Sequence, residues 1–119
     1  MGDKKYNRTF KVKMVVVYAD MKRRVNGNTR APELYLGLPI CTKEEFYEFT
    51  ENDPIYIKLH EKWKESDYDY FYKPSIDRII PEKGYVLSNI RWITEQDNKK
   101  RHKADLSKYD IAYDDDLPF

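Results

Sequence analysis

The sequence has almost no cysteine and no long apolar run, and each shortage excludes a class of protein. Cys41 is the single cysteine among 119 residues, so neither an internal disulfide nor a cysteine-based zinc cluster can form. A lone thiol fits a reducing compartment. The longest apolar run, residues 14–19, is far shorter than the roughly 20 residues that cross a bilayer, and the first residues carry no signal-peptide pattern. We therefore expect a soluble, cytoplasmic protein with no membrane partner.

Charge is divided unevenly along a chain of nearly zero net charge. The whole chain carries +1, and residues 104–119 hold five acids against one base, a net of −4, so the rest carries +5. A basic body with an acidic tail is a layout of nucleic-acid-binding proteins, although such tails can also serve solubility alone. Eleven tyrosines suit either an aromatic core or stacking on nucleic acid. Composition leaves both uses open.

The first half of the chain predicts three helices. Residues 11–25 have apolar side chains near helical spacing, basic residues in the last turn, and an Asn-Gly-Asn stop. The run of three valines at 15–17 also makes a strand possible at the front of this segment. After a loop over residues 26–40, Thr42 and Glu45 form a capping box, and Asp53 with Pro54 begins the next helix. Every fourth residue of that helix is apolar, which predicts a core stripe of Ile55, Leu59 and Trp63. His60, one step off the stripe, is expected to be exposed or half-buried rather than a catalytic base.

The second half predicts a ββα unit. Residues 75–80 alternate like a strand, residues 81–84 form a turn, and residues 90–93 form a second strand. Thr94, with Asp97 three residues later, caps a final helix over about residues 95–103. The expected fold is α+β: a helical N-terminal part, a ββα core at about 74–103 within a domain of residues 1–103, and a flexible acidic tail over residues 104–119.

The string from Pro74 to Asn98 resembles the metal-binding core of HNH (ββα-metal) endonucleases, which are common in bacteriophages. That family typically reads Asp-His-Ile, then Gly-Tyr, then Asn, and finally Glu-Asn-x-x-Lys. Here the corresponding positions are Asp77-Arg78-Ile79, Gly84-Tyr85, Asn89 and Asn98. Residues 36–46 also resemble the lead-in segment of small phage HNH proteins, so the resemblance covers about residues 10–103. It implies a metal-dependent DNA endonuclease in a bacterial host cell.

The resemblance assigns a role to each matching position. Asp77 on the first strand and Asn98 on the helix would be metal ligands, and Asn89 would brace the loop and orient the general base. His102, four residues after Asn98, would supply another ligand or contact phosphate, unless it is an ordinary surface histidine. Oxygen ligands of this kind suit Mg²⁺, with Mn²⁺ as the alternative.

Arg78 departs from the family, which has its water-activating histidine at this position. An arginine cannot accept a proton near neutral pH because its pKa exceeds about 12. Arg78 would instead hold a phosphate with its guanidinium while another group activates water. Alternatively, the site is inactive and the fold is kept for binding. The sequence leaves both readings open.

Basic residues surround the expected site and predict contacts with DNA phosphates. They are Arg78, Lys83, Arg91, Lys99, Lys100, Arg101 and Lys103. A solvated, charged helix face is the alternative explanation for those on the final helix.

The last six residues resemble the C-terminal tip of bacterial single-stranded DNA-binding protein (SSB). They are Asp114, Asp115, Asp116, Leu117, Pro118 and Phe119. The resemblance implies docking onto host proteins that carry a pocket for that tip: RecQ-type helicases, the primosomal helicase, exonuclease I and recombination mediators. Phe119 would fill an apolar pocket, and the aspartates would meet a basic rim. An acidic tail that shields the protein's own basic face is the alternative.

Two functions follow. One is a phage HNH-like endonuclease that the tip delivers to host replication and repair proteins. The other is a catalytically inactive HNH-like protein that competes with host SSB for its partners.

Overall fold

The computed structural model describes residues 8–108, with side chains as far as Arg101, and has the expected α+β composition. Within those residues, four α-helices accompany one two-stranded antiparallel sheet. The order is α1 (Phe10–Val25), α2 (Lys43–Glu51), α3 (Pro54–Glu65), β1 (Pro74–Arg78), β2 (Ile90–Thr94) and α4 (Glu95–Lys108). Short 3-10 turns lie between them, namely η2 (Pro32–Leu34), η3 (Tyr70–Tyr72), η4 (Pro81–Lys83) and η5 (Leu87–Asn89).

The helix starts are set by local capping, as the sequence predicted. The Thr42 hydroxyl accepts the Glu45 N–H at 3.1 Å while the Glu45 carboxylate accepts the Thr42 N–H at 2.8 Å, which confirms the capping box. Asp53 caps α3 by accepting the Ile55 N–H at 3.0 Å. Each cap satisfies backbone N–H groups that the first turn of a helix leaves unpaired, so these starts can be recognised from sequence.

The buried face of α3 differs from the predicted stripe. Ile55 is 54% exposed, whereas Tyr56 and Trp63 are fully buried. Leu59 and His60 are half-buried, so the expectation for His60 is confirmed. The face is rotated because Tyr56 packs against Trp92 of β2 with ring centroids 4.4 Å apart. Burying a large aromatic ring contributes more than burying Ile55 at the helix start.

The predicted ββα unit is present, with changed limits. β1 and β2 pair antiparallel, and Asp77 lies opposite Arg91. β1 ends at Arg78, two residues earlier than expected, because the Ile79 and Ile80 N–H groups are bound by Asn89 instead of a strand. α4 continues to Lys108, so residues 104–108, which the sequence analysis placed in the tail, are helical.

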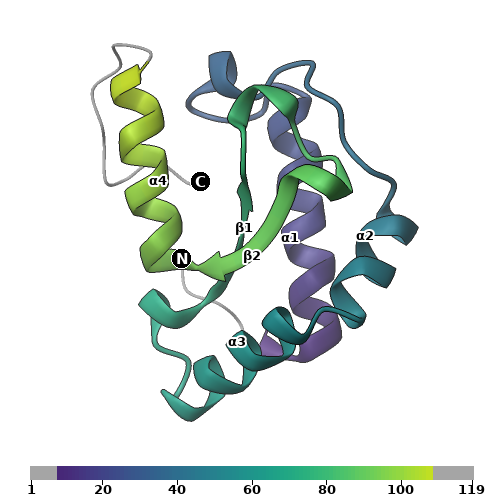
Figure 1. Ribbon diagram of the computed structural model, residues 1–119, viewed down its shortest axis with the longest axis vertical. Helices are drawn as coiled ribbons and strands as arrows, with labels where there is room; N and C mark the ends of the chain where they lie inside the picture. The colour runs from purple at the N-terminus through teal and green to yellow at the C-terminus, as the bar shows by residue number, and fades with distance from the viewer. Residues whose placement is uncertain (1–7, 109–119) are drawn as a thin grey trace.

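The sheet lies between two unequal layers. α4 covers one side, and α1, α2 and α3 lie on the other (Figure 1). All five residues of β1 are buried, and side chains along a strand alternate between faces. Ser75 and Asp77 therefore face α4, while Ile76 and Arg78 face the helical core.

Loop packing fixes the segment between the strands. Gly84 has a φ of +76°, and a Cβ there would lie 2.5 Å from the Pro39 carbonyl oxygen. The next residue, Tyr85, donates its N–H to that same oxygen at 2.8 Å. Only a residue without a Cβ allows this approach, so Gly84 ties the loop of the ββα unit to the segment before α2.

Candidate functional site

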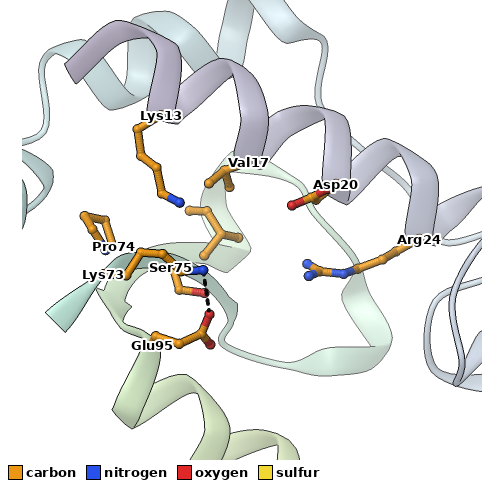
Figure 2. A pocket seen from close by; sticks show the side chains of 9 residues that line it. Lys13, Val17, Asp20, Arg24, Lys73, Pro74, Ser75 and Glu95 are labelled. Atoms are coloured by element: carbon orange, nitrogen blue, oxygen red, sulfur yellow. Dashed lines mark ion pairs between the residues drawn. The ribbon is translucent and has the colours of Figure 1, made fainter. Parts of the chain in front are cut away.

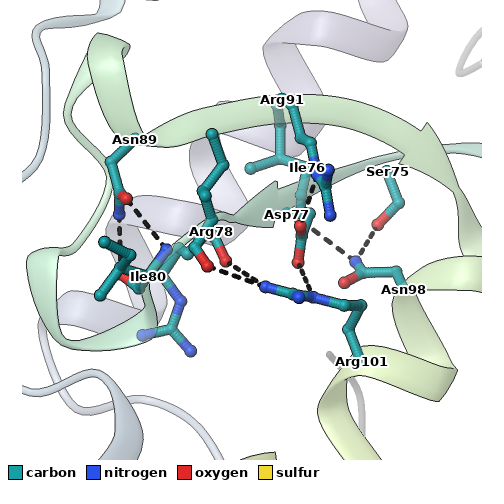
Figure 3. A network of polar contacts seen from close by, with 10 residues as sticks. Ser75, Ile76, Asp77, Arg78, Ile80, Asn89, Arg91, Asn98 and Arg101 are labelled. Carbon is teal, nitrogen blue, oxygen red and sulfur yellow. Dashed lines mark hydrogen bonds and ion pairs between the residues drawn. The ribbon is translucent and has the colours of Figure 1, made fainter.

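The polar centre of the ββα unit is Asp77, which is 4% exposed and paired with two arginines. Its Oδ2 accepts from Arg91 Nε of β2 at 2.9 Å, and its Oδ1 faces Arg101 Nε of α4 at 3.4 Å (Figure 3). The strand register places Arg91 directly across from Asp77. Two guanidinium groups and one carboxylate give this centre a formal charge of +1.

Asn98 of α4 lies beside this centre and has an unsatisfied acceptor. Its side chain is 1% exposed, and its Nδ2 donates to the Ser75 hydroxyl and to the Ile76 carbonyl oxygen. Its Oδ1 is buried without a hydrogen-bond partner, and Figure 3 shows it on the side of Asp77 and Arg101. A buried acceptor without a protein partner costs free energy, and a bound water, an ion or a catalytic role can account for it.

Arg101 links the centre to the end of β1. Besides Asp77, its Nη2 donates to the carbonyl oxygens of Arg78 at 3.2 Å and Ile79 at 2.9 Å. Its side chain stays 39% exposed, and that of Arg91 stays 47% exposed. Both arginines are thus held by the fold while their side chains stay partly exposed, which leaves guanidinium N–H groups that can contact a phosphate.

An open groove on the surface continues from these arginines. It is lined by Arg91, Ile93, Asp97, Lys100 and Arg101. Three of these side chains are cationic and one is anionic, so the groove is formally +2. Of the residues expected to contact DNA, Arg91, Lys100 and Arg101 are brought together here.

Arg78 lies elsewhere, in the core rather than in this groove. It is 4% exposed, and its Nη1 donates to the carbonyl oxygens of Leu34 at 2.8 Å and Pro81 at 2.9 Å. Its guanidinium carbon lies 4.3 Å from the Tyr35 ring centroid. This position does not fit the phosphate contact that the resemblance suggested, because a side chain next to Asp77 on a strand points to the opposite face.

Asn89 braces the loop between the strands, as the resemblance implied. Its Oδ1 accepts the Ile80 N–H at 3.0 Å, and its Nδ2 donates to the carbonyl oxygens of Ile80 and Gly84, both at 2.8 Å. The side chain thereby replaces strand pairing for this turn. All three hydrogen bonds join the Asn89 side chain to backbone groups, so none of them orients a side chain that could act as a general base.

The remaining expected residues lie apart from the groove or outside the description. Lys83 is exposed on η4, and Lys99 lies over the Tyr70 ring at 5.3 Å on the η3 side of α4. His102 and Lys103 lie within α4, and their side chains are outside the description. Residues 109–119, with the SSB-like tip at 114–119, lie outside the described residues altogether.

Sequence reasoning missed a second cluster of buried charge. Lys13 and Arg24 of α1 are 3% and 8% exposed, and they line a small polar cavity together with Lys73 and Glu95 (Figure 2). Lys73 Nζ and Glu95 Oε1 are 3.7 Å apart. A polar cavity of about 40 Å³ fits ordered water. It cannot admit a nucleotide, so we assign it to structure.

Asp77 and Asn98 are the oxygen donors that a hard cation would find at this centre, where Arg91 and Arg101 already face both oxygens of the Asp77 carboxylate. Within residues 8–101, no cluster of three His, Cys, Asp or Glu side chains could hold a metal. Mg²⁺, however, is commonly held by one or two protein oxygens, with water and substrate phosphate completing its shell. The Asp77 carboxylate retains acceptor capacity beside its two arginines, and Asn98 Oδ1 supplies an unpaired oxygen next to it.

Comparison with protein-family models, with curated proteins and with solved structures found no match to this chain. None of the helices in residues 8–108 is long and apolar enough to cross a membrane.

Proposed function

We propose that the protein is a metal-dependent DNA endonuclease whose site is formed by Asp77 and Asn98 of an HNH-like ββα unit. The observation that carries the proposal is the buried, unpaired Oδ1 of Asn98 on the side of the Asp77 carboxylate. These two oxygens lie on facing elements, β1 and α4, and the two arginines that pair with Asp77 also line the cationic groove. The Asn98 Nδ2 is satisfied by Ser75 and Ile76, so Oδ1 alone is left as an acceptor for a ligand.

In this proposal the groove receives the DNA backbone. Arg91, Lys100 and Arg101 contact phosphates in this groove. Such contacts give affinity with little sequence preference. Arg91 and Arg101 also hold the Asp77 carboxylate in one orientation through their Nε donors, so the same residues position the site and the substrate.

Asp77 and Asn98 would hold the divalent cation, Mg²⁺ or Mn²⁺. Bound there, it would stabilise the negative charge that develops on the scissile phosphate and on the leaving oxygen. Arg101 then lies on the side of the site where the phosphate enters. Arg78 has no part in this chemistry, because its guanidinium is bound within the core.

Cleavage of supercoiled, linear and single-stranded DNA in the presence of Mg²⁺ or Mn²⁺ tests the proposal. Wild type should nick DNA only with added metal, and Asp77→Ala and Asn98→Ala should lose this activity. Glu61→Gln, which changes an exposed carboxylate of α3, is the control and should cleave like wild type. If wild type does not nick DNA when metal is added, the endonuclease proposal is contradicted.

A second function is favoured by the position of Arg78. The residue that replaces the family's general base is turned into the core, and within residues 8–101 no histidine lies at the Asp77 centre: His60 instead bonds the Arg8 carbonyl oxygen at 2.7 Å. The alternative is therefore a catalytically inactive binding protein. Its SSB-like tip, Asp114 to Phe119, would compete with host SSB for partners such as exonuclease I and RecQ-type helicases.

Deleting Phe119 tests the tip independently of the nuclease site. Wild type should compete with an SSB tip peptide for purified exonuclease I, and the truncated chain should not. Equal competition by both would contradict the mimicry. A result in which the tip binds and no metal-dependent cleavage occurs would select the binding protein over the enzyme.

A further inference from the structure

Three consecutive aromatic side chains on η3 are about half exposed. Tyr70, Phe71 and Tyr72 are 48%, 52% and 47% exposed. Large aromatic rings are normally placed in the core, and this chain does bury Tyr35, Tyr56 and Tyr85 there. A run of three exposed rings on one turn is therefore a candidate interaction surface, and the proposed nuclease site does not use it.

Cations are held directly at this surface. Lys73 Nζ lies 4.7 Å and Lys99 Nζ 5.3 Å from the Tyr70 ring centroid. Phe71 meets Tyr70 with ring centroids 5.9 Å apart and planes at 73°. Lys73 also pairs with Glu95 and is only 18% exposed, so Lys99 is the cation that Tyr70 can offer to a ligand at this surface. Exposed aromatic rings beside fixed positive charges match the two parts of a single-stranded nucleic acid, unpaired bases and phosphates.

The surface and the cationic groove lie on two flanks of the same helix. η3 packs against α4, and Lys99 faces η3 while Arg101 faces the Asp77 centre. Lys99 and Arg101 are two positions apart, so their side chains point about 200° apart around the helix axis. Lys100 therefore lies on the outer ridge of α4, between the two flanks. α4 is about 10–12 Å across with its side chains. A strand of a few nucleotides can therefore cross it from the rings to the groove.

We infer that η3 is a stacking platform for unpaired bases, so that the protein's substrate is DNA with a single-stranded or unpaired stretch beside the cleaved phosphate. Phe71 and Tyr72 stack the bases, and Tyr70 holds Lys99 against an adjoining phosphate. The inference rests on the proposed function, since it assumes that the groove of Arg91, Lys100 and Arg101 takes the same strand. Double-stranded DNA, whose bases are already stacked, gains nothing from the platform.

The test compares an oligothymidylate with an abasic deoxyribose-phosphate strand of the same length, which has equal charge and no bases. Wild type should bind the oligothymidylate about tenfold more tightly, because stacking on aromatic side chains adds to the phosphate contacts. The double variant Phe71→Ala/Tyr72→Ala should lose at least about fivefold of this preference. Leu36→Ala removes an apolar side chain that is 63% exposed elsewhere and should keep the preference.

Lys100→Ala separates the two proposals. It should weaken binding to both strands by the same factor and leave the preference for bases unchanged. If the platform variant loses the preference for oligothymidylate and Lys100→Ala weakens binding to both strands, the platform and the groove are both supported. If the platform variant keeps the preference, or wild type shows none, the platform is overturned and the groove is not affected. No effect of Lys100→Ala, with the preference present, overturns the groove and the assignment of the cleaved strand to it, and leaves the stacking of bases on η3.

Two further outcomes are informative. If wild type binds neither strand, the platform and the groove are both overturned. If sedimentation shows that wild type self-associates and the platform variant does not, the rings are a contact between two copies of the chain and the stacking platform is overturned. Far-ultraviolet circular dichroism of each variant checks that it is folded.

Discussion

The guanidinium carbon of Arg78 lies 4.3 Å from the ring centroid of Tyr35, inside the protein rather than beside the neighbouring Asp77. The same group also lies 5.6 Å from the Tyr85 ring, and these two rings stack with planes 10° apart. From α1, Arg24 Nη1 donates to the Tyr85 hydroxyl at 3.4 Å. Two buried arginines and two tyrosines thus join α1, η2 and the loop of the ββα unit.

Arg78→Lys should lower the free energy of unfolding by about 2–4 kcal/mol. An ammonium group can neither stack on Tyr35 nor reach both carbonyl oxygens as the planar guanidinium does, and hydrogen bonds to charged groups contribute about 1.5–3 kcal/mol each. Urea denaturation measures the effect. Arg23→Lys, at an exposed ion pair with Asp20, should change stability by no more than about 0.5 kcal/mol. Equal stabilities of the two variants would contradict a structural role for Arg78.

Asn89→Asp should destabilise the protein by about 2–4 kcal/mol. The carboxylate can still accept the Ile80 N–H, but it cannot donate to the Ile80 and Gly84 carbonyl oxygens and would face them with a negative charge. Asn52→Asp is the matched control, because Asn52 makes one exposed bond to the Glu48 carbonyl oxygen. Thermal unfolding should separate the two variants clearly, and similar midpoints would show that Asn89 does not brace the loop.

Cys41 should react slowly with iodoacetamide in the native protein. Burial raises the pKa of its thiol, so the reactive thiolate is scarcer than in the unfolded chain across about pH 7–9. Because the native pKa is the higher one, the contribution to stability is present below the unfolded pKa and is lost as pH rises through the native value. Alkylation rates with and without urea measure this, and equal rates would contradict the burial.

Lys100→Ala should reduce the salt dependence of DNA binding. One fewer phosphate contact lowers the slope of log affinity against log salt concentration by about 0.9 on duplex DNA. Lys58→Ala removes an exposed lysine of α3, away from the groove, and should leave the slope unchanged. Fluorescence anisotropy of a labelled duplex across a salt series measures both. A slope equally unchanged in Lys100→Ala would remove this residue from the interface.

Elements with local signals were predictable from the sequence. The capping residues Thr42 and Asp53 mark helix starts that the structure has, and the alternation after Pro74 marks a strand. Element ends that depend on tertiary contacts were not predictable. β1 stops at Arg78 because Asn89, eleven residues later, takes over the backbone groups of Ile80.

The candidate site was predicted in part, through the motif rather than through the strand pattern. Applied strictly, the alternation along β1 separates Asp77 from Arg78, because neighbouring strand residues face opposite sides of a sheet. The motif treats them as one unit, which led to the expected phosphate contact. The partners of Asp77 depend on register and helix packing: Arg91 is its cross-strand neighbour, and Arg101 reaches it from α4.

The most direct test of the proposed nuclease site is to measure DNA affinity and metal-dependent cleavage for Asp77→Asn. Asparagine keeps the size of the side chain and removes the negative charge that would hold the proposed cation, so cleavage should fall by about 100-fold or more. Affinity measured without metal should stay the same or increase, because the centre becomes more positive beside Arg91 and Arg101. Undiminished cleavage by Asp77→Asn, or a parallel loss of binding and cleavage, would contradict a catalytic centre at Asp77.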